Sequence, residues 1–329
     1  MLDVNGFKGF LETRKLSKEA TESSLEVLLD FEAYLTKKNK DIETAKRQDF
    51  YDYSTQLIKT AKNTPENYIS ILRYAYLKKL NEIIIAGMEV LDGSEVIENF
   101  SKRLTSEFDE GLRDYVFEGV EIPPLGISPK EKPQYTRKLV TRLEKKIGTE
   151  ECVKFLNRGL RNRYEESRKP DREKFLKSKS VDNFLEQKHK DLIAELETHL
   201  KNGTLFFTQE ITKEVLEYVK ADPYIESGVR EGVKIIVKKI PHMAKEYLAE
   251  EDAQQKRYYY CHCPWVKEAL RGSGKPVSSV FCNCSAGFYR AYWEIVFNQP
   301  VRVDLLESLL KGDSICKFAV HIPNLGDGA

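Results

Sequence analysis

Apolar residues recur at helical spacing through the first third of the chain. One predicted helix follows the candidate cap Ser17, and its apolar face is made of Leu25, Leu28, Leu29 and Leu35. A second begins at Thr64-Pro65, where threonine can cap and proline fits the first turn, and its apolar side holds Tyr68, Leu72, Ala75 and Tyr76. No alternation typical of strands interrupts this pattern, so we predict a helical domain over residues 1–116.

The pattern breaks at residues 117–133, FEGVEIPPLGISPKEKP, which hold four prolines and two glycines. Proline lacks a backbone donor and cannot continue a helix, so this stretch is predicted to be a linker. Residues 134–329 then form the second predicted domain, which fits the prior of two domains for a chain of this length.

Strand-like segments appear only late in the chain. They are predicted at residues 233–240, 257–263, 277–284 and 314–322, with helices beginning near Pro264 and Ser285. In the last segment, Cys316, Phe318 and Val320 share one face. The predicted fold class is α+β: an all-helical N-terminal domain followed by a mixed α/β ligand-binding domain with a small sheet.

The charge balance argues against strong electrostatic capture by nucleic acid or by an anionic membrane. The net charge is +1, and residues 1–110 carry a net charge of about −4. No apolar run approaches the roughly 20 residues that cross a bilayer, and the start of the chain lacks the apolar core of a signal peptide. We therefore expect a cytoplasmic protein. The stretch Arg271–Lys275, RGSGK, lacks the first glycine of a phosphate loop and is predicted to be a polar turn.

Two C-x-C pairs, Cys261 with Cys263 and Cys282 with Cys284, are the strongest chemical signal. Reducing compartments disfavour disulfides, so such a cluster indicates metal ligation or catalysis. In a strand, residues two apart face the same side, and four converging thiolates are what tetrahedral zinc accepts. Each pair comes just before a predicted helix start, whose partial positive charge is expected to lower the thiol pKa.

The exact ligand set stays open. If the register differs, His262, Cys316 or His321 could replace one thiol. An iron–sulfur cluster would use the same donors. The four side chains could also be reduced thiols lining a packed or ligand-holding interior.

The second domain resembles the ligand-binding domains that include vinyl-4-reductase-type domains and L-2-amino-thiazoline-4-carboxylic acid hydrolase-like proteins. The likeness rests on CNCSAGF (Cys282–Phe288), the following helix and GDSICKF (Gly312–Phe318), and covers mainly residues 230–323. It implies a small α/β ligand pocket, and some relatives bind zinc through cysteine with acidic or histidine side chains. Only Cys282, Cys284 and Cys316 of this chain match positions of the family pattern. The CHCPW segment (Cys261–Trp265) lies outside that pattern.

The first domain resembles the helical core-binding domain of phage-type integrases, through residues 16–35 and 63–82. Integrase chemistry also needs an H-x-x-R motif with a nucleophilic tyrosine. None of the five histidines has arginine at the third following position, so integrase or recombinase activity is excluded. A helical module for packing or partner contact is the better interpretation.

Three functions fit the sequence. The first is a zinc-binding protein or sensor with a small-molecule pocket made of Tyr258, Trp265, Phe288 and Tyr292. The second, implied by the resemblance, is a hydrolase of a small cyclic or amide-like compound, with metal-bound water or Cys284 as nucleophile and His262 as base. The third is a DNA-associated regulator, which the acidic first domain disfavours. A homodimer is possible in each.

Overall fold

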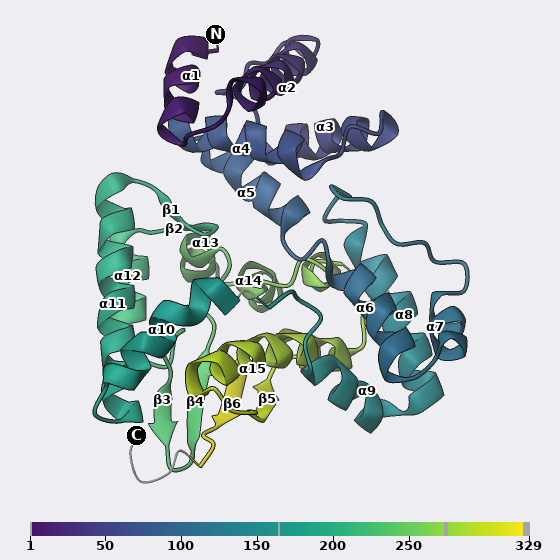
Figure 1. Cartoon of the computed structure of the whole chain (residues 1–329), viewed down its shortest axis with the longest axis vertical. Coiled ribbons are helices and arrows are strands. Elements are labelled where there is room, and N and C mark those ends of the chain that lie inside the picture. The colour runs from purple at the N-terminus through teal and green to yellow at the C-terminus, as the bar shows by residue number, and fades with distance from the viewer. Residues whose placement is uncertain (1, 164, 273–275, 325–329) are drawn as a thin grey trace. The chain divides into compact units, whose positions relative to one another are not determined.

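The computed structural model of the chain describes residues 2–163, 165–272 and 276–324, so most of the predicted polar turn at Arg271–Lys275 lies outside the described residues. The chain divides into two compact units. Unit 1 comprises Met1–Ser94 and Ile122–Glu131, and unit 2 comprises Glu95–Glu121 and Lys132–Ala329 (Figure 1).

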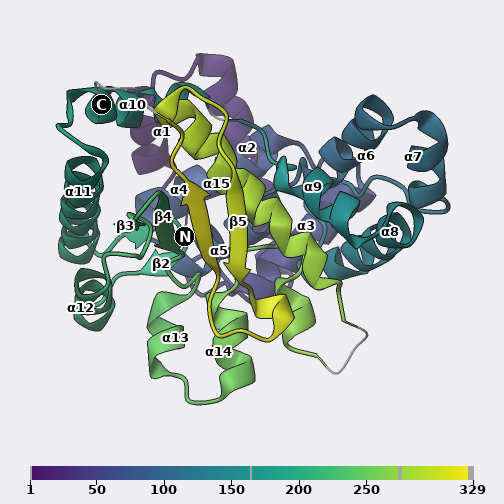
Figure 2. The ribbon, with the colours of Figure 1, turned by 90° about the horizontal axis from the view of Figure 1, so that it is seen from below.

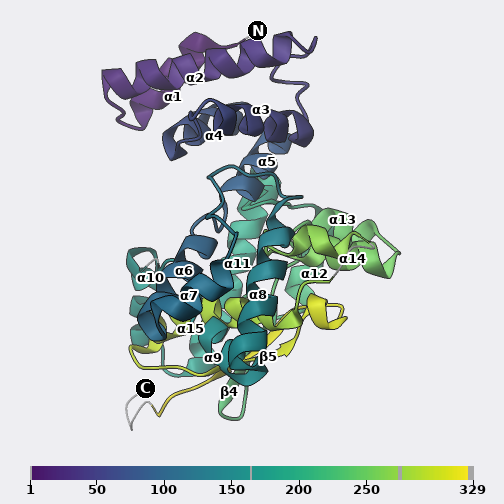
Figure 3. The ribbon, with the colours of Figure 1, turned by 90° about the vertical axis from the view of Figure 1, so that its right-hand side faces the viewer.

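Unit 1 is helical (Figure 3). The caps are those predicted: the Ser17 side chain accepts from the backbone of Ala20, and Thr64 accepts from Asn67 with Pro65 in the first turn. Most predicted core residues are buried, but Leu29 and Tyr76 are 50% and 49% exposed, so the buried faces are narrower than the sequence pattern suggested. The helices are α1 (Val4–Thr13), α2 (Lys18–Thr36), α3 (Arg47–Lys59), α4 (Pro65–Lys78) and α5 (Asn81–Leu91).

Residues 122–131, from the predicted linker, pack with these helices. The Ser54 hydroxyl donates to the carbonyl of Gly126 over 2.5 Å, and the Asn63 side-chain amide donates to the carbonyl of Leu125 over 3.0 Å. Gly126 has a φ of +90°, and a β-carbon there would overlap the Tyr68 hydroxyl. Unit 1 is therefore built from two separated stretches of the chain.

The helices of unit 2 begin before the predicted linker. Helices α6 and α7, which the sequence analysis placed in the first domain, pack within unit 2, where the Phe100 ring lies 5.4 Å from that of Phe155. The helices are α6 (Val96–Glu107), α7 (Glu110–Phe117), α8 (Lys132–Ile147), α9 (Thr149–Asn157), α10 (Glu165–Lys177), α11 (Val181–Asn202), α12 (Lys213–Ala221), α13 (Ala244–Ala249), α14 (Ala253–Tyr260) and α15 (Asn283–Phe297), with short 3-10 helices η1 (Lys267–Leu270), η2 (Ser279–Cys282) and η3 (Leu309–Lys311).

The described residues of unit 2 also form two antiparallel sheets. The smaller pairs β1 (Leu205–Phe206) with β2 (Gln209–Glu210). The larger has the strand order β3-β4-β6-β5 and is made of β3 (Val229–Glu231), β4 (Lys234–Lys238), β5 (Val303–Glu307) and β6 (Lys317–His321).

Helix α15 covers one face of the larger sheet (Figure 2). The register places Ile235 opposite Val320 and Val237 opposite Phe318, and all four side chains join the buried cluster that includes Trp293 of α15. Residues two apart on β4 and β6 thus bury the same face, as the alternation at residues 314–322 predicted. This packing fixes the first turn of α15 beside the start of β6.

The α+β class is confirmed, with a helical N-terminal region and a mixed C-terminal region. Two predicted strands are wrong. Residues 257–263 form the end of α14 and an irregular segment, and residues 277–284 form η2 and the first turn of α15. Within the part of the chain described, no helix combines the length and the apolar character that spanning a membrane requires.

Candidate functional site

Four cysteines from three segments line one small cavity of unit 2. They are Cys261 and Cys263 after α14, Cys282 at the end of η2, and Cys316 just before β6. The cavity, which we call the thiol cavity, has a volume of about 20 Å³. That is room for about one water-sized particle.

Backbone hydrogen bonds hold the three segments. The amide of Cys261 donates to the carbonyls of Arg257 and Tyr258, which ends α14 and leaves Cys261 in extended backbone. The amide of Lys239 donates to the carbonyl of Cys316 over 3.3 Å, joining the end of β4 to the start of β6. The Tyr260 hydroxyl donates to the Lys239 carbonyl over 2.6 Å, so α14 is fixed to the same point.

Cys284 does not line the thiol cavity, although the sequence grouped it with Cys282. Both residues lie in helical rather than extended backbone, because Cys282 caps α15 and Cys284 is in its first turn. Successive helical residues turn by about 100°, so residues two apart point to nearly opposite sides. Cys284 is buried away from the thiol cavity. The fourth cysteine that lines the cavity is Cys316, which was predicted as an extra ligand.

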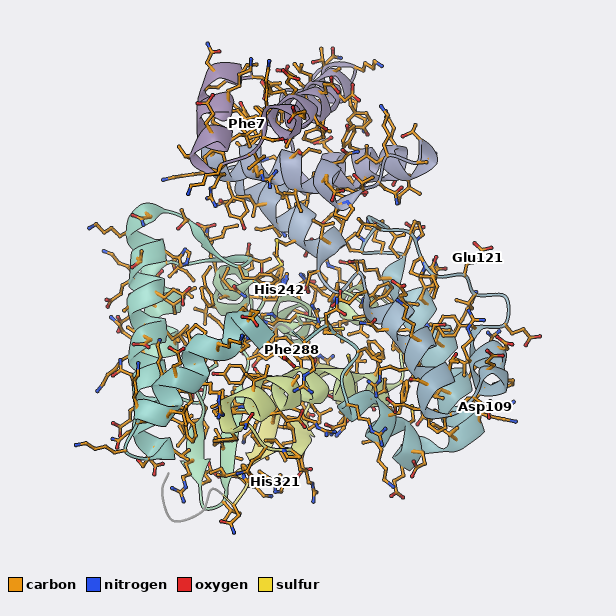
Figure 4. All side chains as sticks on the ribbon, in the orientation of Figure 1. Phe7, Asp109, Glu121, His242, Phe288 and His321 are labelled. Atoms are coloured by element: carbon orange, nitrogen blue, oxygen red, sulfur yellow. The ribbon has the colours of Figure 1, made fainter. Side chains whose placement is uncertain are left out.

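The two candidate histidines differ in position. His262 lines the thiol cavity, and its Nε2 is hydrogen-bonded to the carbonyl of Ile240. His321 is the last residue of β6, at the opposite end of this strand from Cys316 and at the lower end of the sheet in Figure 4, and its Nε2 is 2.7 Å from a carboxylate oxygen of Asp304. His321 therefore does not line the thiol cavity and is not placed to act as a ligand with its cysteines.

The expected lowering of the thiol pKa values is wrong. Burial raises the pKa of Cys261 and Cys282 well above the ordinary value, with smaller contributions from neighbouring thiols. Burial likewise raises the pKa of Cys316 and takes that of Cys284 to about 11. Desolvation outweighs the helix start, so these thiols are protonated at neutral pH unless a cation compensates the charge.

Lys239 is a cation beside these thiols that no sequence pattern predicts. It lines the thiol cavity, its ammonium is 3.3 Å from the Ser285 hydroxyl, and its charge lowers the pKa of Cys284 and Cys316 against the larger effect of burial. No motif marks it, because its place follows from the pairing of β4 with β6.

The four cysteines of the thiol cavity are donors that suit a soft metal ion. In the present side-chain conformations they are not arranged around a common point. Thiolates are preferred ligands of zinc, and the cavity has the size of one ion. Among the described residues, no three or more His, Cys, Asp and Glu side chains are arranged as a metal-binding group. Binding would require the cysteine side chains to rotate toward the cavity centre.

The four predicted pocket residues separate into two places. Phe288 and Tyr292 of α15 line a second cavity of about 270 Å³, which we call the aromatic cavity; Figure 4 labels Phe288 on its helix. Tyr258 instead donates its hydroxyl to Glu268 over 2.9 Å. Trp265 is buried against Tyr135.

Part of unit 2 matches a known protein family. Residues 237–324 match the model of a family of unknown function (DUF6144), which covers less than half of the chain. No curated protein and no solved structure matches the chain. Every residue that lines the thiol cavity lies inside the matched segment, whereas the part of the aromatic cavity formed by residues 168–226 lies outside it.

Proposed function

We propose that the chain binds one zinc ion in the thiol cavity, with Cys261, Cys263, Cys282 and Cys316 as ligands, and that this ion is structural. The observation that carries the proposal is the meeting of four cysteines from three segments around a cavity of one-ion size. Such an ion would join the end of α14, the start of α15 and the start of β6.

The charge of the surroundings supports this assignment. Four thiolates around a divalent ion leave a net negative charge, which is costly in a buried site. Lys239 lines the same cavity and supplies a compensating positive charge. Because metal binding releases the thiol protons, the raised pKa values make zinc uptake weaker as the pH falls.

A hydrolase is less well supported. Cys284, the predicted nucleophile, is buried, lies off the thiol cavity and has a pKa raised to about 11. His262, the predicted base, is engaged by the carbonyl of Ile240. A cavity of about 20 Å³ also has no room for an organic substrate beside the thiols, since ligand pockets measure about 300–1,000 Å³.

An iron–sulfur cluster and a DNA-binding role are also less well supported than zinc. The cluster contains several iron and sulfide ions and would need more space than the thiol cavity offers. DNA binding by the first helices would need clustered positive charge, while residues 1–110 carry a net charge of about −4.

Metal analysis with paired cysteine variants tests the proposal. Protein produced with zinc in the medium is expected to hold about one zinc per chain, with four sulfur ligands at about 2.3 Å by X-ray absorption. Cys316→Ser should lose most of the zinc, and the matched control Cys284→Ser should keep it. Equal zinc loss in both variants, or no zinc in the unmodified protein, would contradict the ligand set. Visible absorption by the purified protein would favour an iron–sulfur cluster instead.

A further inference from the structure

The aromatic cavity is separate from the thiol cavity and lies among α10, α11, β1 and α15 of unit 2. Its volume of about 270 Å³ is close to the lower limit of small-molecule pockets. Six aromatic rings provide most of its apolar lining: Phe184, Phe206, Phe288, Tyr289, Tyr292 and Trp293. A ligand here would therefore be small and have an apolar body.

Several charged groups around this cavity are already paired. The Lys174 ammonium is 2.6 Å from a carboxylate oxygen of Asp191, and the Tyr292 hydroxyl donates to a carboxylate oxygen of Asp171 over 2.9 Å. A carboxylate oxygen of Glu226 accepts from the backbone of Ile240 over 3.0 Å. These carboxylates are thus engaged by the protein and are poor candidates for binding a cationic ligand.

One buried polar group of the lining has no hydrogen-bond partner among the described residues. The Trp293 indole nitrogen is buried without a hydrogen-bond partner in the described part of the chain, and the whole residue is 1% exposed. An indole N–H can only donate, so the missing partner of Trp293 is an acceptor. Unpaired buried donors cost stability, which a bound ligand could restore.

Lys188 adds a positive charge to the same lining. Its ammonium donates to the backbone carbonyl of Glu226 and lies 5.5 Å from the centre of the Tyr292 ring. It forms no ion pair with a carboxylate among residues 2–163, 165–272 and 276–324, although Asp171 and Glu226 are near enough to act on its charge, as is Arg168. Burial is the largest influence on this amine and lowers its pKa.

We propose that the aromatic cavity binds a small monocarboxylate with an apolar body, such as an aromatic ring or a short hydrocarbon chain. Its carboxylate would accept from Lys188 and from the Trp293 indole nitrogen, while its body packs on the aromatic rings.

The charges of the lining favour a ligand with one negative charge over a ligand with two. The side chains comprise three cations, on Arg168, Lys174 and Lys188, and four carboxylates, on Asp171, Asp191, Glu195 and Glu226. A dianion would meet this excess of negative charge. A cationic ligand would compete with Arg168 and Lys188, which both already lie near the Tyr292 ring.

Titration calorimetry of the full chain with three matched probes tests the proposal. Phenylacetate carries the carboxylate, phenylacetamide is its neutral counterpart, and 2-phenylethylamine carries a positive charge. We expect phenylacetate to bind at least about tenfold more tightly than either of the others, because only it forms a charge-assisted hydrogen bond with Lys188.

Variants of the lining then test whether the preference for phenylacetate depends on Lys188. Lys188→Met should weaken phenylacetate binding about tenfold and leave phenylacetamide binding nearly unchanged, while Lys188→Arg should retain much of the preference. Lys190→Met, which removes an exposed cation from the same helix that does not line the cavity, should change affinity less than about twofold. Thermal melting checks that each variant is folded.

Three results would overturn the proposal: no binding of phenylacetate at about 1 mM, tighter binding of 2-phenylethylamine, or unchanged phenylacetate affinity in a folded Lys188→Met variant. Because Lys188 lies outside the thiol cavity, zinc content in these variants reports separately on the metal site.

Discussion

Cys152 has surroundings that make it chemically inert. It lies on α9 of unit 2, is fully buried and lines neither cavity. Burial raises the pKa of its thiol to about 12, with a smaller contribution from the charge of Glu144. The thiolate is the reactive form, so this cysteine should be unreactive while unit 2 is folded.

We therefore expect Cys152 to escape alkylation by iodoacetamide at pH 8 in the native protein and to react in urea, as measured by peptide mass spectrometry. Modification under native conditions at the rate of a free thiol would show that α9 opens readily.

The same thiol should make stability depend on pH. Its pKa is raised by folding, so its contribution is complete below the unfolded value of about 8.5 and is lost as the pH rises toward 12. Between pH 7.5 and pH 10 the unmodified protein should lose about 2 kcal/mol more free energy of unfolding than Cys152→Ala. Urea denaturation at both pH values measures the difference, and equal losses would contradict the buried environment.

At the scale of elements, the cysteine segments explain why the site was only partly predicted. RYYYCHC has residues typical of strands, yet Asp252 caps a helix by accepting from the backbone of Gln255 over 2.7 Å. That cap was visible in the sequence and was overlooked. Cys261 and Cys263 still lie together because the backbone after α14 is extended at Cys261. Cys284 was misplaced because the predicted strand at residues 277–284 is a helix start.

Other features of unit 2 depended on tertiary structure. The strand at 317–321 follows from local alternation and the strand at 234–238 from a short run of β-branched residues, so both were predicted. Lys188 and Lys239 were missed because a single lysine has no pattern, and their roles arise only when distant elements pack around them.

The turn just after α9 and helix α15 approach each other through two glycines, Gly159 and Gly287. A β-carbon on Gly287 would lie 2.2 Å from the backbone nitrogen of Gly159, and Gly159 itself has a φ of +80°. These contacts are with backbone, which cannot move aside as a flexible side chain can. The close approach holds the N-terminal part of α15 in place, close to Cys284 and Cys282.

We expect Gly287→Ala to destabilise the protein by about 1–3 kcal/mol or more, measured by urea denaturation. Gly9→Ala is the control, because an added β-carbon on this helical glycine meets no atom within 4 Å. That change should be neutral or stabilising by up to about 1 kcal/mol. A neutral Gly287→Ala would mean that the turn just after α9 and helix α15 are further apart than described.

At the scale of the whole molecule, the chain passes between the two units more than once. It leaves unit 1 after Ser94, returns for Ile122–Glu131 and leaves again at Lys132. The sequence predicted two domains from the helical pattern and the prolines. It could not predict this return, because the hydrogen bonds from Ser54 and Asn63 join residues more than sixty positions apart.

A fragment of residues 1–94 should therefore be less stable than one in which residues 122–131 are joined to it by a flexible linker. Loss of this segment leaves the hydroxyls of Ser54 and Tyr68 without the Gly126 backbone that covers them. Thermal unfolding followed by circular dichroism compares the two. Equal melting temperatures would show that the returning segment adds nothing to unit 1.

The return of the chain also bears on how such a protein can change during evolution. A recombination event that copies one uninterrupted stretch of gene cannot transfer all of unit 1 without also carrying the codons for residues 95–121, which belong to unit 2. The helical unit is thus expected to be inherited together with its neighbour, rather than shuffled alone between unrelated genes.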